Sequence, residues 1–169
     1  MTTLLSIFRT SHHVISLSLA DLTDEIARRR TRGNEGPSVT WTVGHLLDAR
    51  HKVLAYLGDS GPSPWASDFR DAAATSGAEY PSIDTMRADW ERMHEALERA
   101  FAECASDALD QPAARAGIHG ETTIRDRVAF LAWHEAYHAG VIGAVRTAAG
   151  LPGPAVLARE ASATAAARS

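Results

Sequence analysis

Several features that would define a function class are scarce in this sequence. Its 169 residues include a single cysteine, Cys104, so no internal disulfide can form and a reducing compartment is expected. No uninterrupted apolar run approaches the ~18 residues needed to cross a bilayer, which excludes an integral membrane protein. The N-terminal segment lacks the basic region of a signal peptide, and Arg9 interrupts its apolar run. We therefore predict a cytoplasmic protein without contact to the membrane.

An excess of basic side chains is also lacking. The chain has 17 lysines and arginines against 21 aspartates and glutamates, a net charge of -4, so no overall positive field would attract nucleic acid or anionic lipid. The one basic cluster, Arg28 to Arg32, is interpreted as the solvated end of a helix. With 45% hydrophobic and 22% charged residues, the composition is that of one globular domain. No nucleic-acid partner is predicted.

No segment shows the alternation typical of β-strands, whereas four segments carry apolar residues at steps of three, four or seven, which predicts helices. Ser82 is the expected N-cap of the third helix, and Thr123 with Asp126 resembles a capping box at the start of the fourth. We predict an all-α four-helix bundle over residues 1–152 and a partly flexible, Ala-rich tail over 153–169. The predicted helices cover residues 4–26, 37–57, 82–105 and 123–150.

The connection between the second and third predicted helices is unusually long. It runs from Gly58 to Pro81, is rich in Gly, Ser, Ala and Pro, and has no sustained period. Connections of this length are often lids over sites or crossovers between distant helices. Both roles stay open for this segment.

The most specific local pattern is Trp133-His134-Glu135-Ala136-Tyr137-His138 in the fourth predicted helix. His134 and His138 lie one turn apart on the apolar stripe, where two imidazoles can bind one divalent ion. As ordinary core residues, both would need hydrogen-bond acceptors, and burial without them costs ~1 to 3 kcal/mol each. Metal binding is therefore favoured over a purely structural role.

The same letters match H-E-x-x-H, in which two histidines bind zinc and the glutamate is a general base. The metzincin extension requires Gly and His where this chain has Val141 and Ala144. Glu160, the downstream carboxylate that could complete a zincin site, lies beyond Gly150 and Pro152 in the tail. A zincin is a weak alternative, and a third ligand must come from another helix. His45 is the best candidate, although periodicity points its side chain away from the stripe of the second helix.

The order of these motifs resembles a known family. A Gly-His-Leu at Gly44 to Leu46, placed after Trp41 in the second helix, and then W-H-E-x-Y-H-x-G from Trp133 to Gly140 resemble the DinB/YfiT-like superfamily. The resemblance covers the chain from about Ser6 to Pro152. It implies an up-down-down-up bundle with the long second connection as the crossover. It also implies one divalent ion, zinc or nickel, on His45, His134 and His138.

The resemblance further implies a class of reaction. Activities in that family include transferases that use low-molecular-weight thiols and a thiol-dependent isomerase, which favours a metal-dependent transferase with a small-molecule substrate. One departure is Val141, because many members have glutamine there. A metal-dependent hydrolase of small substrates and a non-catalytic metal- or ligand-binding stress protein are the alternatives. A homodimer is expected from the resemblance.

Further residues are candidates for binding substrate or supporting the ligands. His12 lies on the inward stripe of the first helix, and Asp48 follows His45 by one turn, where it could orient that ring. Trp41 and Tyr137 could form walls of the site, although aromatic residues in bundles more often belong to the core. Glu135 points about 100° away from His134, which indicates a solvent-side or supporting position.

Overall fold

The computed structural model describes residues 2–31, 35–59, 61–64, 69, 80–105, 107–117 and 119–167. Within these residues all regular structure is helical, as the sequence predicts. Four long helices, α1 (Thr2–Leu19), α3 (Val39–Tyr56), α5 (Ile83–Glu103) and α6 (Ile124–Ala148), form the bundle. Three short elements complete it: α2 (Asp24–Ala27), the 3-10 turn η1 (Ala108–Asp110) and α7 (Pro154–Ala166).

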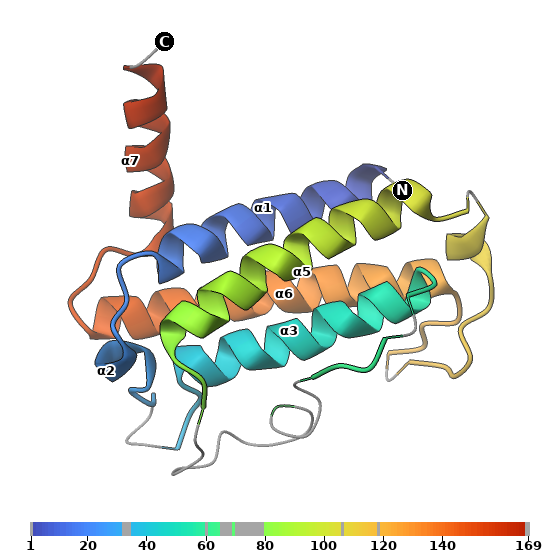
Figure 1. Ribbon diagram of the computed structural model, residues 1–169, viewed down its shortest axis with the longest axis horizontal. Helices are drawn as coiled ribbons and strands as arrows, with labels where there is room; N and C mark the ends of the chain where they lie inside the picture. Colours follow the sequence, from blue (N-terminus) through green and yellow to red (C-terminus); the bar gives the residue numbers. More distant parts are fainter. Residues whose placement is uncertain are drawn as a thin grey trace.

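The four long helices lie side by side, with α1 and α6 running in one direction and α3 and α5 in the opposite one (Figure 1). Each long helix packs against two others, in the cyclic order α1, α6, α3, α5. Their apolar stripes meet in one core whose largest buried members include Trp90, Phe8, Phe101 and Leu97. No helix in the described part of the chain has the length and apolarity to span a membrane.

The helices begin where the sequence places their caps. The Ser82 hydroxyl accepts a hydrogen bond from the Thr85 backbone N–H, and Ser38 caps α3 in the same way. Thr123 and Asp126 form a complete capping box at the start of α6. After α6, Gly150 adopts a φ of +79°, which favours glycine and turns the chain away from the helix axis.

The predicted end of the first helix is wrong. It was expected to continue to Ile26, but α1 ends at Leu19 and α2 begins after Thr23, whose hydroxyl accepts from the Ile26 backbone N–H. The two segments share an apolar pattern because Leu22 is buried and Ile26 packs against the core. The N-cap at Thr23 therefore separates two helices that periodicity alone predicts as one.

The predicted tail contains a helix. Pro152 does not continue α6, but Pro154 stands at the first position of α7, where its fixed φ favours a new helix. Alanines, which have the highest helix propensity, follow. α7 contacts α1, has no buried residue and projects from one end of the bundle (Figure 1). Of the long connection, residues 60, 65–68 and 70–79 lie outside the described residues, so its predicted role as lid or crossover stays a prediction.

Candidate metal centre

Two neighbouring helices bring three histidines together. His45 lies in the second turn of α3, and His134 and His138 lie one turn apart near the middle of α6. The Nε2 atom of His45 is 3.0 Å from Nε2 of His134, which is 3.1 Å from Nε2 of His138. His138 is buried, and the other two rings are half-buried. The histidine that periodicity placed on the outer side of its helix thus faces the pair on α6.

The spacing of these nitrogens fits one divalent ion. Metal–nitrogen bonds of ~2.05 Å place two ligand nitrogens about 2.9 Å apart at octahedral angles and about 3.3 Å apart at tetrahedral angles. The observed separations of 3.0 and 3.1 Å lie within this range. One ligand atom from each of the three histidines lies within 4.8 Å of the others. The donor set, three imidazoles, suits zinc and nickel alike.

The ring of His45 is oriented by a hydrogen bond to the backbone. Its Nδ1 atom is 3.0 Å from the carbonyl oxygen of Phe69. Because a carbonyl only accepts, Nδ1 carries the proton and Nε2 presents its lone pair to the cluster. Histidine ligands of metals are commonly fixed in this manner. The Trp41 ring stacks on His45, with centroids 4.9 Å apart and an 8° interplanar angle.

The two histidines on α6 are held in their neutral form. Burial lowers the pKa of His138 to about 3, and the neighbouring imidazoles of His134 and His45 add to this shift. Burial likewise lowers the pKa of His134 to about 4, with smaller contributions from His45 and the Lys52 ammonium. Both rings therefore have a free lone pair at neutral pH, which is the form that binds a metal.

Comparison with protein families agrees with this geometry. The family model of the DinB superfamily matches residues 7–142, which include all three histidines. The chain belongs to the DinB superfamily. No curated protein matches it. The resemblance inferred from the two motifs is confirmed at the level of the family, and the three-histidine cluster of this DinB chain is compatible with a divalent metal site.

The other residues singled out in this DinB chain lie in different surroundings. The side chain of Tyr137 is 58% exposed, and its ring meets that of His138 edge-on at 5.0 Å. Asp48 is buried, with its carboxylate 2.8 Å from the Lys52 ammonium. His12 stacks on His94 of α5 at 3.7 Å and lies 3.1 Å from the Glu91 carboxylate.

Glu135 does not lie on the solvent side, which was one of the two positions, solvent-side or supporting, predicted from its helical angle. Its side chain is 2% exposed, and its carboxylate accepts two hydrogen bonds of 2.8 Å from Arg50 of α3. Glu135 is buried despite this angle because α6 packs against both α1 and α3. Sequence reasoning also missed Arg50, which is fully buried. A signal was present, because Arg50 lies three residues after Leu47 and three before Val53, on the apolar stripe of α3.

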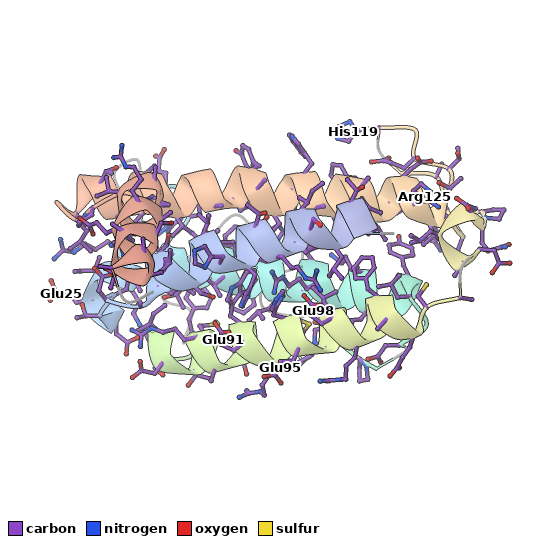
Figure 2. The ribbon with its side chains drawn as sticks, turned by 90° about the horizontal axis from the view of Figure 1, so that it is seen from above. Glu25, Glu91, Glu95, Glu98, His119 and Arg125 are labelled. Carbon is purple, nitrogen blue, oxygen red and sulfur yellow. The ribbon has the colours of Figure 1, made fainter. Side chains whose placement is uncertain are left out.

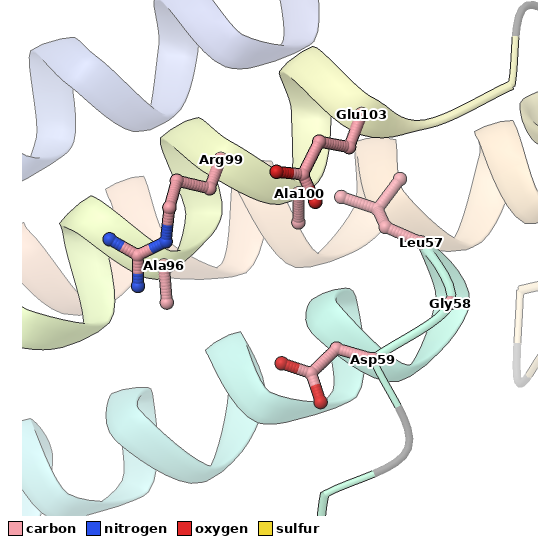
Figure 3. Close-up of a pocket in the computed structure, with 7 residues that line it drawn as sticks. All are labelled: Leu57, Gly58, Asp59, Ala96, Arg99, Ala100 and Glu103. Carbon is pink, nitrogen blue, oxygen red and sulfur yellow. The ribbon is translucent and has the colours of Figure 1, made fainter.

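A separate pocket of about 390 Å³ lies between the C-terminal ends of α3 and α5 (Figure 3). Its lining includes the apolar residues Leu57, Ala96 and Ala100 and the charged side chains of Asp59, Arg99 and Glu103. None of the three histidines lines it. It is therefore distinct from the candidate metal centre.

Gly44→Ala is expected to weaken zinc binding by about 10 to 100-fold, the usual effect of losing a group that orients a ligand. A Cβ atom at Gly44 would lie 2.4 Å from the Phe69 ring, so Phe69 must move and its carbonyl would leave the Nδ1 atom of His45. Competition with a chelating indicator measures the affinity. Gly140→Ala is the control, because its Cβ would meet nothing within 4 Å. Equal affinities of the two variants would contradict this role of Phe69.

The metal-free protein is expected to lose stability as the pH falls below 6.5. The pKa values of His134 and His138 lie at about 4 and about 3 in the folded chain, against an ordinary value of 6.5. The unfolded chain therefore binds more protons between these values, and the free energy of unfolding decreases with decreasing pH. Urea denaturation at pH 7 and pH 5 tests this above the main range of carboxylate titration. Combined replacement of both histidines by alanine should reduce the dependence of the free energy of unfolding on pH in this range.

Proposed function

We propose that this DinB protein binds one zinc or nickel ion through His45, His134 and His138, and that it is a transferase acting with a low-molecular-weight thiol. The convergence of three Nε2 atoms from two helices supports the metal site. A divalent ion held by three neutral imidazoles supplies positive charge and open coordination positions, which favour the ionised form of a thiol. The chain's own contribution is to keep the imidazoles of His134 and His138 neutral and to orient the ring of His45.

The surroundings of Glu135 favour a transferase over a hydrolase of the H-E-x-x-H kind. In such hydrolases the glutamate removes a proton from the attacking water. Here both carboxylate oxygens of Glu135 accept hydrogen bonds from Arg50, and the side chain is buried. The carboxylate that the motif would offer as general base is therefore occupied. A thiol, which ionises far more readily than water, has less need of a base.

Elemental analysis of protein purified without an immobilised-metal column tests the first part of this proposal. About one equivalent of zinc or nickel in the wild type is the expected result. The second part is tested by mixing the loaded protein with a small thiol and an alkyl halide or epoxide, and following thiol consumption against a chelated sample. Ester or amide turnover without thiol would instead identify a hydrolase. A protein that neither contains nor accepts these metals would overturn the proposal.

We further propose that the chain forms a homodimer in the cytoplasm through the exposed face of α6. Between Arg127 and Arg146 the only Asp, Glu, Lys or Arg is Glu135, which is buried, while Trp133 is 60% and Tyr137 58% exposed. By contrast, α5 carries Glu91, Glu95 and Glu98 along its length (Figure 2). Charge-depleted surfaces with exposed aromatic residues are typical of interfaces. A monomer in analytical sedimentation would contradict the dimer. The proposed location in the cytoplasm is supported by the single cysteine, since it suits a reducing compartment.

A further inference from the structure

A buried ion pair joins the two helices that carry the histidines. The guanidinium of Arg50 on α3 donates from Nε and Nη2 to the two carboxylate oxygens of Glu135 on α6, each at 2.8 Å. Arg50 is fully buried, and Glu135 is 2% exposed. Arg50 also lies over the ring of Trp90 on α5, with 3.6 Å from its central carbon to the ring centroid. The pair thus links three of the four long helices.

Stability alone does not explain this pair. Removing two charges from water costs several kcal/mol per ion, and well-packed hydrophobic residues in their place are often as stable or more stable. A bidentate pair between a planar guanidinium and a carboxylate does, however, fix direction and distance more strictly than apolar packing does. Its distinctive contribution is geometric, because it holds α3 and α6 at one relative position along their axes.

The position that it fixes is the one that the histidines require. Glu135 directly follows His134, and Arg50 comes five residues after His45 on a continuous helix. A helix rises 1.5 Å per residue, so a slip of α3 against α6 by about one residue would move the His45 nitrogen by about 1.5 Å. Metal sites tolerate deviations of only about 0.2 Å in ligand distance. Small shifts between the two helices would therefore impair binding.

We infer that Arg50 and Glu135 are positioning residues that set His45 of α3 against His134 and His138 of α6. This inference rests on the proposed metal site, which it deepens by assigning a role to the glutamate of the W-H-E-x-Y-H motif. The pair acts through the helices and does not touch the ion. Its loss should therefore change the affinity and geometry of the site while the bundle remains folded.

The test is the double variant Arg50→Met with Glu135→Leu, which removes both charges together and keeps the side-chain volume similar. We expect its helix content and unfolding midpoint to equal or exceed those of the wild type. Its zinc affinity should fall at least about 10-fold, as for lost supporting contacts elsewhere. The visible spectrum of the cobalt-loaded protein, which reports ligand geometry, should shift. Arg50→Lys, which keeps the charge but loses the planar guanidinium, should likewise lower the zinc affinity and shift the cobalt spectrum.

Arg146→Met is the matched control. Arg146 is another fully buried arginine and lies on α6 like His134 and His138. It donates hydrogen bonds to Asp21 and to the Ser18 carbonyl at the end of α1. Its loss should lower stability and leave zinc affinity and the cobalt spectrum unchanged. Wild-type affinity and spectrum in the double variant would overturn the positioning role while the metal site stands. Absence of zinc and cobalt binding by the wild type would overturn the proposed function and this inference together.

Discussion

Glu135→Leu alone is expected to lower the free energy of unfolding by about 3–5 kcal/mol, the usual cost of breaking a buried pair from one side. The substitution leaves the Arg50 guanidinium fully buried and without its counter-charge, and its other close partner, the Trp90 ring, replaces only part of the lost interaction. Domains of this size are stable by about 5–15 kcal/mol, so the loss is a large share of the total. Urea denaturation of the metal-free protein at pH 7 measures it.

An exposed pair supplies the control for this experiment. Glu25 and Arg29 of the short helix region around α2 approach to 2.5 Å, with side chains 79% and 54% exposed. Glu25→Leu should change stability by less than about 1 kcal/mol, because solvent screens exposed pairs. If Glu135→Leu lowered the free energy of unfolding no more than Glu25→Leu does, Arg50 would not be left buried and unpaired. Restoration of stability by adding Arg50→Met would show that the cost comes from the isolated charge.

The fold was predictable because local signals agree with tertiary packing. Ser82, Thr123 and Asp126 cap their helices as hydroxyl and carboxylate side chains do in any chain, since the bonds they make are to backbone groups within four residues. The stripe of α5 was equally clear because one face of that helix packs on the core and the other is charged. At Thr23 the two signals disagree, because the apolar stripe continues while the threonine can cap a new helix. The structure shows that the N-cap prevails and that a separate helix, α2, begins there.

The metal centre was only partly predictable from the residues. His134 and His138 are related by one helical turn, so their proximity follows from helix geometry alone. His45 reaches them from another helix, and periodicity failed for it because α3 is covered on several sides: by α5, by α6, and by Phe69, whose ring lies against Gly44. A helix buried around most of its circumference has no single inward face. Arg50 and its pairing with Glu135 were missed for the same reason, since this contact depends on how two helices distant in the sequence meet.

His45→Ala, His134→Ala and His138→Ala are each expected to lower zinc affinity by at least about 100-fold, more than the loss of an orienting contact, because each removes a direct bond to the ion. The three Nε2 atoms form one cluster, with neighbouring separations of 3.0 and 3.1 Å, and no one ring can replace another. His51→Ala is the control, because His51 lies on α3 like His45 but outside the cluster. Isothermal titration calorimetry measures the zinc affinity of all four variants.

Thermal unfolding distinguishes metal ligands from histidines that only pack in the core. A ligand that binds only the folded state stabilises it by about 2.7 kcal/mol at 100 times its dissociation constant, so the Tm of the wild type should rise with zinc concentration. Replacement of a ligand should abolish this rise whatever it does to the metal-free Tm. If the three histidines served the core alone, His138→Ala would lower the metal-free Tm through the cavity it leaves, and zinc would shift neither protein. A zinc-dependent Tm in the wild type that is lost with any one of the three imidazoles therefore requires that the ion be bound by all of them.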